Sequence, residues 1–283
     1  MFITLKLKNI LIALIITMII LSGITGVFAE NPDEEYIPVP ILMYHSILKD
    51  NSASLEYIVT PSQLEEDLKY LKENGYSAIT VTDLIEYVHN VKELPQKPII
   101  LSFDDGHYNN YYYAYPLIKK YGMKMVISVV GKYSDTFSEG DDSNPSYSYL
   151  TWKQIGELHN SGYAEILNHT YDLHSITKER YGCKKNKGEN QQDYKKMLTD
   201  DLGNLQKKLY EQTGSYPVAF TYPFGGVSEA SYDIIKEMGF KASLSCKSGI
   251  NKITKDKNCL YMLKRLIRPS GKSSEEYFAK ILN

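Results

Sequence analysis

The chain has 283 residues, of which 43% are hydrophobic and 23% are charged. This composition provides material for a real core and excludes a disordered, collagen-like or coiled-coil protein. The formal net charge of −2 at pH 7 gives no indication of the excess of basic residues that is typical of nucleic-acid-binding proteins.

The first 29 residues have the pattern of a secretory signal peptide. Lys6 and Lys8 precede an apolar run over residues 10–21, and small residues follow as far as Ala29. The uncharged stretch is also about 20 residues long, enough to cross a bilayer, so an uncleaved membrane anchor is the alternative. We expect residues 1–29 to direct export, which places the protein outside the cell, secreted or held at the cell surface.

The remainder of the chain is predicted to form one exported domain. Residues 30–38 include a short acidic linker, and no second linker interrupts residues 39–283. Cys183, Cys246 and Cys259 are too few for a disulfide framework, which small exported proteins often use. At most one bridge can form, and the sequence does not decide whether Cys246 and Cys259 are joined.

Short apolar runs alternate with helical patterns along this domain. The predicted strands are 39–45, 77–81, 98–103, 124–130, 164–167, 218–222, 241–245 and 262–267. The predicted helices begin at Pro61 and Asp83 and then cover 109–121, 151–161, 193–213 and 229–238. The first helix has the clearest limits, because Thr60 is a good N-cap, proline follows it and Gly75 lies just past the end.

This alternation predicts an α/β fold with a parallel sheet, since parallel neighbours need a crossover connection. Eight candidate strands in about 250 residues suit a single β/α barrel better than two small sheets. In such barrels the chemistry lies at the C-terminal ends of the strands. Polar residues that directly follow predicted strands are therefore the candidates for a functional site.

Two aspartates, Asp104 and Asp105, leave the predicted strand 98–103 and precede Gly106. Two carboxylates buried without partners would cost several kcal/mol, so something must compensate them. A solvated turn is the alternative, because Asp-Gly sequences are common in turns. A glycosidase pair is less favoured, since its carboxylates lie ~5 to 9 Å apart across a sugar bond, whereas neighbours in an extended chain point to opposite sides.

Two histidines, His169 and His174, follow the predicted strand 164–167. A spacing of five fits neither one face of a helix nor one face of a strand, so the zinc-protease helix is excluded and the two rings can meet only across a turn. Two imidazoles and a strand-end carboxylate would fill three positions of a tetrahedral ion and leave the fourth for water. Non-haem iron oxygenases use the same ligands, usually on another fold.

Two further strand ends carry candidate residues. His45 follows the apolar start of the first strand, and the stretch from Phe220 to Gly226 contains a Pro-Phe-Gly turn whose backbone N–H groups could face an oxyanion. A bound metal lowers the pKa of water toward ~7 and polarises a carbonyl. Hydrolysis of an amide or ester then needs a base, for which the second aspartate is available.

Together these motifs resemble the polysaccharide deacetylase (NodB-homology) family, carbohydrate esterase family 4. Its SFDDG or TFDDG string is found at Ser102–Gly106, its His-Thr/Ser…His string at His169–His174, and its Pro-aromatic-Gly string at Pro223–Gly225. The match covers residues 39–268. It implies metal-dependent removal of acetyl groups from N-acetylated sugars on a distorted (β/α) barrel of seven or eight strands.

The resemblance also implies a role for each matching residue. Asp104 is expected to be the general base, and Asp105, His169 and His174 the ligands of one divalent metal ion, zinc above all, with cobalt, nickel or iron as alternatives. The backbone N–H of Tyr222 is expected to stabilise the oxyanion. The implied partner is a polysaccharide; no nucleic acid is implied, and membrane contact is expected only through an uncleaved N-terminal segment.

The sequence departs from the common family pattern in three places. Four residues separate the motif histidines where many members have three, Thr221 stands where many have arginine, and the last strand lacks the usual histidine acid. The first strand with its Met-Tyr-His-Ser sequence, the longer histidine spacing and the late arginine are similar to the branch that deacetylates poly-β-1,6-N-acetylglucosamine. In that branch the first-strand histidine is the proposed acid, which implies His45 as the acid and Arg265 as the residue that orients Asp104.

The sequence leaves two alternative functions open and gives expectations for three further features. The same site could serve an O-acetyl esterase on a polysaccharide, and the missing arginine and histidine would suit a catalytically silent wall-binding protein. His107 could reach the metal or only fill a position that is often aromatic in the family, and the second is expected. The loops 132–149 and 175–192 are expected to border the substrate groove.

Overall fold

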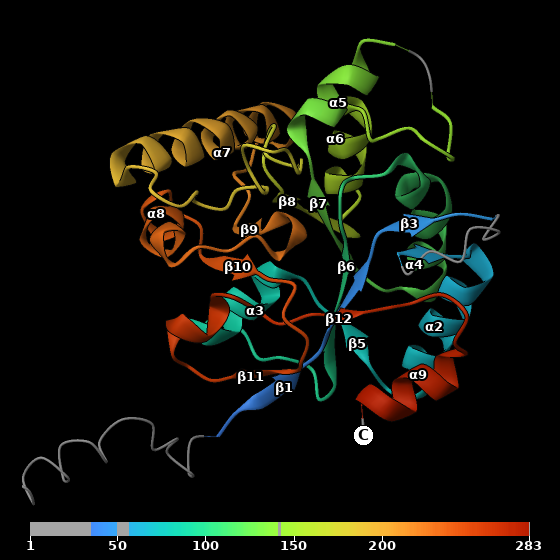
Figure 1. Cartoon of the computed structure of the whole chain (residues 1–283). Helices are drawn as coiled ribbons and strands as arrows, with labels where there is room; N and C mark the ends of the chain where they lie inside the picture. Colours follow the sequence, from blue (N-terminus) through green and yellow to red (C-terminus); the bar gives the residue numbers. More distant parts are fainter. Residues whose placement is uncertain (1–34, 50–56, 141–142, 283) are drawn as a thin grey trace, which may run out of the picture. The chain divides into compact units, whose positions relative to one another are not determined.

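A curled parallel sheet is the centre of the computed structural model, which describes residues 35–49, 57–140 and 143–282 (Figure 1). Its strands run in the order β10–β9–β8–β7–β6–β2–β12, and β5 adds to β6 beside this path. In that order the strands are Ala242–Leu244, Ala219–Thr221, Ala164–Asn168, Met125–Val129, Pro98–Phe103, Ile41–Tyr44 and Leu266–Ile267, with β5 at Ser77–Ala78. Every pairing between them is parallel.

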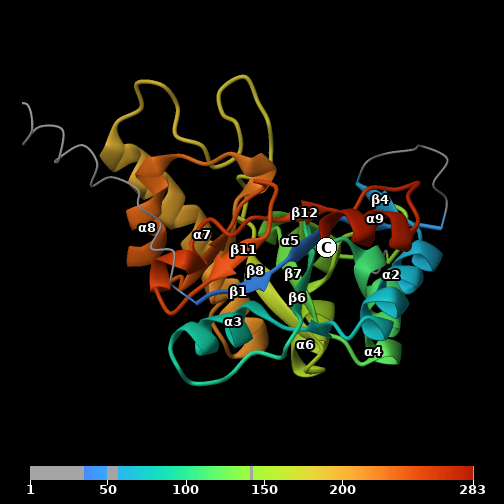
Figure 2. The ribbon, with the colours of Figure 1, turned by 90° about the horizontal axis from the view of Figure 1, so that it is seen from below.

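All six predicted helices are present, with limits within two residues of those expected. They are α2 (Pro61–Glu73), α3 (Val81–Val88), α4 (Tyr115–Tyr121) after a π-helical turn η1 (Asn110–Ala114), α6 (Trp152–Asn160), α7 (Gln191–Thr213) and α8 (Tyr232–Glu237) after a 3-10 turn η3 (Glu229–Ser231). The Thr60 hydroxyl accepts a hydrogen bond from the backbone N–H of Gln63, as expected of an N-cap. Figure 2 shows α2 and α4 on one flank of the sheet and α7 and α8 on the other.

Two α-helices in the described residues were not predicted. The segment expected as the loop 132–149 begins with α5 (Gly131–Ser138), and the chain ends in α9 (Ser274–Ile281), which packs with α2. The start of α5 carries no side-chain cap and begins with glycine, so it lacks the usual start signals. Both helices are eight residues long, and helices this short depend on tertiary packing more than on local preference.

The sheet closes into a distorted β/α barrel, which confirms the predicted fold class. The backbone N–H of Leu263 donates to Ser243 O over 2.8 Å, and that of Arg265 donates to Lys247 O over 2.9 Å. The same segment then pairs with β2 through β12. Residues 263–267 therefore link the β10 edge to the β2 edge, but only two residues of the predicted strand 262–267 form a regular strand.

The first predicted strand, 39–45, is divided into short pieces. β1 (Ile37–Val39) pairs antiparallel with β11 (Asn251–Ile253), β2 joins the barrel, and β3 (Ser46–Ile47) pairs with β4 (Ile58–Val59). Pro40 separates the first two pieces; proline has no N–H to donate to a sheet, so continuous pairing is interrupted there. The third piece lies beyond His45, at the C-terminal edge of the barrel.

Alternate strand residues face two different cores, as the pleat of a β-strand requires. The outer face packs against helices α2, α4, α6 and α7 and includes Leu42, Leu101, Phe103 and Ile127. The inner face includes Ile41, Ile100, Val126, Leu167, Ala219 and Leu263. Counting in steps of two from the inner residues leads to His45, Asp104 and His169, each one residue past a strand end, to Thr221 at the end of β9, and to Arg265 just before β12.

The N-terminal predictions lie largely outside the described residues. This applies to the signal peptide or anchor at 1–29 and to the linker 30–38 as far as residue 34. From Ile37 onward the chain belongs to one compact unit. Within the described ranges, no helix is both long enough and apolar enough to cross a membrane.

Candidate active site

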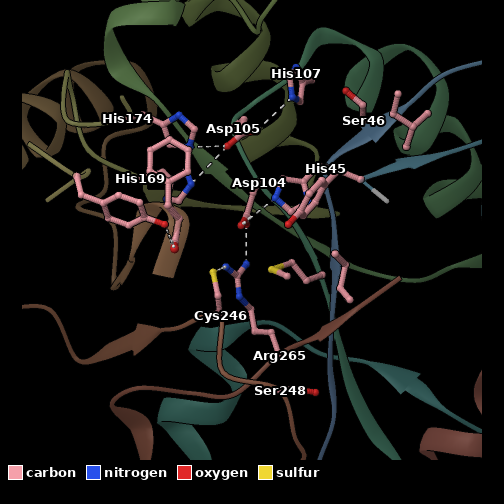
Figure 3. Close-up of a pocket in the computed structure, with 16 residues that line it drawn as sticks. His45, Ser46, Asp104, Asp105, His107, His169, His174, Cys246, Ser248 and Arg265 are labelled. Carbon is pink, nitrogen blue, oxygen red and sulfur yellow. Dashed lines mark hydrogen bonds and ion pairs between the residues drawn. The ribbon is translucent and has the colours of Figure 1, made fainter. Parts of the chain in front are cut away.

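The predicted site residues meet at the C-terminal edge of the barrel, around a pocket of about 680 Å³. Six of the seven line it: His45, Asp104, Asp105, His169, His174 and Arg265 (Figure 3). The loop 175–192 contributes Tyr181 to the wall, as expected. The loop 132–149 contributes none of the lining residues in its described part, although Tyr133 and Tyr149 contact His174 and His107 from behind.

The turn after β6 separates the two adjacent carboxylates. Asp105 adopts a left-handed conformation with φ 69°, and Gly106 follows with φ 71°. A side chain at Gly106 would place its Cβ 3.1 Å from Cγ1 of Val129, so the turn needs glycine there. As a result Asp104 points to Arg265 and His45, whereas Asp105 points to the other histidines (Figure 3).

Asp105, His169 and His174 form a group that could hold a metal ion. Their ligand atoms all lie within 4.8 Å of one another. Oδ1 of Asp105 is 3.0 Å from Nε2 of His174 and 3.5 Å from Nε2 of His169. Nδ1 of His169 lies 2.7 Å from Thr221 O, so this nitrogen donates its proton and leaves the lone pair of Nε2 for an ion. The carboxylate and two imidazoles, with the hydrogen bond from His169 to Thr221 O, therefore fit a divalent metal ion.

The pKa of the Asp105 carboxyl agrees with a ligand role. Burial alone would raise this pKa, but contacts with His107, His169 and His174 hold it well below the ordinary value. The carboxylate is therefore ionised throughout the neutral range and needs no proton release before it binds a cation.

The turn that the histidine spacing requires is present between His169 and His174. Thr170 has φ 74°, which is costly for a β-branched residue and reverses the chain direction. The Asn168 side chain supports this conformation, since Oδ1 accepts the N–H of Thr170 over 2.9 Å and Nδ2 donates to Leu202 O over 3.0 Å. The two rings thus reach one carboxylate oxygen although their spacing fits no regular element.

Two residues outside the pocket lining, which the sequence analysis did not identify, form hydrogen bonds with the backbone of the His169–His174 turn. Asp201, in α7, accepts the backbone N–H groups of Tyr171 and Asp172, each over 2.8 Å. Burial raises the pKa of Asp201 to about 6. From the unpredicted helix α5, the Tyr133 hydroxyl donates to His174 O over 3.2 Å. Neither residue lies at a strand end, so the rule that located the other site residues could not find them.

Asp104 lies on the other side of the site with Arg265. Nη1 of Arg265 is 2.7 Å from Oδ1 of Asp104 and 3.2 Å from the Ser102 hydroxyl, and Nε donates to Ser245 O over 2.9 Å. The Asp104 and Arg265 side chains are only 3% and 0% exposed. Burial would raise the pKa of Asp104, but the Arg265 guanidinium and the nearby histidines lower it below its usual value. This contact is the one expected of a residue that orients Asp104.

His45 faces the remaining oxygen of Asp104. Its Nε2 is 3.9 Å from Oδ2, and its ring packs edge-on against Tyr57. Nδ1 is buried and has no hydrogen-bond partner in the described residues. Burial lowers the pKa of His45, although Asp104 and Asp105 partly offset this effect.

The expected role of Tyr222 is wrong for this structure. Its backbone N–H donates to Leu244 O over 3.0 Å in the sheet, so it cannot face an oxyanion. Two-residue periodicity places Tyr222 on the outer face with Phe220, where its hydroxyl lies 2.7 Å from that of Ser231. The neighbouring turn lies at the pocket instead, because Phe224 lines it and its ring is 4.4 Å from that of His174.

Two other expectations concern His107 and the cysteines. His107 does stack on an aromatic ring, that of Tyr149, but its Nε2 also lies 3.3 Å from Oδ2 of Asp105. No disulfide joins cysteines in the described part of the chain, so Cys246 and Cys259 are not bridged. Cys246 lies beside Arg265 at the pocket wall, with Sγ 3.7 Å from Nη2.

Comparisons with known proteins agree with this geometry. The poly-beta-1,6-N-acetyl-D-glucosamine N-deacetylase of Staphylococcus aureus (strain N315) is 26% identical, over 80% of this chain and 77% of its own length. The enzyme of the same name from Escherichia coli (strain K12) is 23% identical over 85% of this chain. The present chain spans only 38% of the length of that relative.

A solved structure and a family model complete the comparison. The structure of a de-N-acetylase from Aggregatibacter actinomycetemcomitans superposes with a TM-score of 0.72 at 27% identity, covering 86% of this chain and 100% of that chain. The model for polysaccharide deacetylase matches residues 91–243, more than half of the chain. The match includes both aspartates, both motif histidines and the Pro-Phe-Gly turn. The chain therefore belongs to the polysaccharide deacetylase family.

Proposed function

We propose that this protein is a metal-dependent hydrolase that removes N-acetyl groups from a polysaccharide containing N-acetylglucosamine. The observation that carries the proposal is the pairing, in one pocket, of a three-ligand cluster with a separate carboxylate that Arg265 holds. Relatives named as N-deacetylases of such a polymer match four-fifths or more of this chain and support the choice of substrate.

The residues on the two sides of the pocket have different tasks in this mechanism. A divalent ion held by Asp105, His169 and His174 would lower the pKa of water and polarise the acetyl carbonyl. Asp104 accepts the proton of the attacking water through Oδ2, because Oδ1 is occupied by Arg265. His45, whose Nε2 lies 3.9 Å from that same oxygen, would relay this proton to the departing amine, which leaves Asp104 ionised again. An amine leaves poorly as an anion, so an amide substrate needs this proton more than an ester does.

The oxyanion needs a new donor, since the N–H of Tyr222 is occupied. The backbone of Pro223–Gly225 is the nearest alternative, because Phe224 lines the pocket and has φ 55°. We assign this task to the N–H of Phe224, which lies two residues beyond the position first expected. One such donor is worth about 10²- to 10³-fold in kcat in other hydrolases.

The metal and the location complete the proposal. Two imidazoles and one carboxylate with an open position suit zinc, and cobalt, nickel or iron(II) accept the same donors. The signal-like residues 1–29 would bring the enzyme to polymers of the cell wall or the extracellular matrix.

An acetate-release assay tests the function. The substrates are β-1,6-linked N-acetylglucosamine oligomers, chitooligosaccharides, peptidoglycan and O-acetylated xylan, each with zinc and with a chelator. We expect chelator-sensitive acetate release from at least one N-acetylated substrate, and loss of this activity in Asp104→Asn, which keeps the size of the side chain but removes the base. Release from xylan alone would favour the esterase alternative, and polymer binding without any release would favour the silent one.

A further inference from the structure

His107 is fixed beside the metal-ligand cluster by its backbone as well as by its ring. The residue forms an antiparallel bridge with Tyr149, and hydrogen bonds of 2.8 Å join the neighbouring residues on both sides. Its imidazole stacks on the ring of Tyr149, with ring centroids 4.8 Å apart. The side chain is 19% exposed and points toward Asp105 from the side opposite His169 and His174 (Figure 3).

The three histidines share the Asp105 carboxylate unequally. His169 and His174 approach Oδ1, whereas Nε2 of His107 lies 3.3 Å from Oδ2, at the outer end of hydrogen-bond distance. An ion held by the cluster would take the Nε2 lone pairs of His169 and His174, so that neither nitrogen could donate to the carboxylate. His107 is not needed as a ligand, so its Nε2–H stays available to Asp105.

We infer that His107 is a positioning residue that donates to Oδ2 of Asp105 and so keeps Oδ1 turned toward the metal. The inference rests on the proposed metal site. A ligand carboxylate without a second contact can rotate about its χ2 bond, and ordering it then reduces the binding free energy of the ion. Outer contacts of this kind change metal affinity by about 10- to 100-fold in other proteins.

Two substitutions separate donation from packing. His107→Phe keeps a ring that can stack on Tyr149 but removes the donor, whereas His107→Gln removes the ring but keeps an N–H group near the position of Nε2. His159→Ala, in α6, changes a histidine outside the pocket and is the control. The zinc affinity of the full-length chain and of each variant is measured by competition with a chromophoric chelator, and the melting temperature is measured without metal.

We expect His107→Phe to bind zinc about 10- to 100-fold more weakly, His107→Gln to recover most of the affinity, and the control to bind normally. The melting temperatures without metal should differ little. Wild-type affinity in His107→Phe would overturn the inference and leave the proposed function intact, as would equal losses in both variants. A changed visible spectrum of the cobalt-loaded His107→Gln variant would also overturn it, because His107 would then be a ligand. Absence of metal binding by the wild type would overturn both proposals.

Discussion

The buried pair of Asp104 and Arg265 makes the sharpest prediction, because its strength can be measured without any substrate. We consider Arg265→Met, which keeps an apolar stem but removes the charge, Asp104→Asn, and the double variant. Arg265→Met leaves the Asp104 carboxylate buried, 3% exposed, without its nearest cation. Asp104→Asn leaves the Arg265 guanidinium buried, 0% exposed, without its carboxylate partner.

Removal of one partner of a buried ion pair costs about 3 to 5 kcal/mol, because the remaining charge stays away from water. In a domain of this size that corresponds to a fall in melting temperature of about 6 to 20 °C for each single variant. The double variant buries no net charge at this position, so its cost should be well below the sum of the two. We expect a coupling free energy of about 3 kcal/mol.

The free energies of unfolding of the four proteins are measured by urea denaturation in the presence of a chelator, so that no ion contributes. Lys120 and Glu65 provide a matched control, since they form an ion pair whose side chains are 61% and 36% exposed. Their coupling should be below about 1 kcal/mol and should weaken with salt. A coupling of Asp104 with Arg265 as small as that of the control pair would refute the argument that Arg265 is the counter-charge of the base.

Three further predictions test other parts of the structure. His45→Ala should lower turnover about 10²-fold or more with unchanged metal content, and loss of metal or unaltered turnover would refute the acid role. Asp201→Asn should weaken zinc binding about 10-fold, as checked by chelator competition, because the N–H groups of Tyr171 and Asp172 use different carboxylate oxygens and the substitution turns one of these into an NH2 group that cannot accept. Burial would raise the pKa of Asp83, but contacts with Lys92, Thr80 and Lys124 lower it in the folded protein. The ionised Asp83 side chain therefore stabilises the fold above about pH 4, the pKa in the unfolded chain, and this stabilisation is lost as the pH falls through the lower pKa of the folded state. Asp83→Asn should therefore be destabilised by about 1 to 2 kcal/mol at pH 6, as measured by urea denaturation, and much less near pH 2; an equal difference at both would contradict the charge argument.

The sequence predicted those parts of the site that follow from strand geometry. In a parallel barrel all strands end at one edge, and every second residue faces inward. His45, Asp104 and His169 each follow a strand and have the inward parity, so their meeting could be expected from the order of elements alone. The error at Tyr222 has another cause, because sheet pairing continues one residue beyond β9 and the Tyr222 N–H donates to Leu244 O.

The supporting residues could not be predicted because their partners are distant in the sequence. Asp201 lies within a long helix among polar neighbours. Only the fold brings it close to the backbone of Tyr171, which is 30 residues earlier in the sequence. Tyr133 belongs to helix α5, which has weak start signals. The role of Arg265 came from the family resemblance, since only the barrel closure places it opposite Asp104.

The left-handed residue at Asp105 gives two neighbouring carboxylates separate roles. If both faced the same group of cations, their mutual repulsion would favour protonation of one of them and raise its pKa. The turn instead gives Asp104 the guanidinium of Arg265, and gives Asp105 the imidazoles around it. The pKa of each carboxyl is consequently lowered in spite of burial. Both groups stay ionised, as a base and a metal ligand must, because one backbone inversion gives each carboxylate its own set of partners.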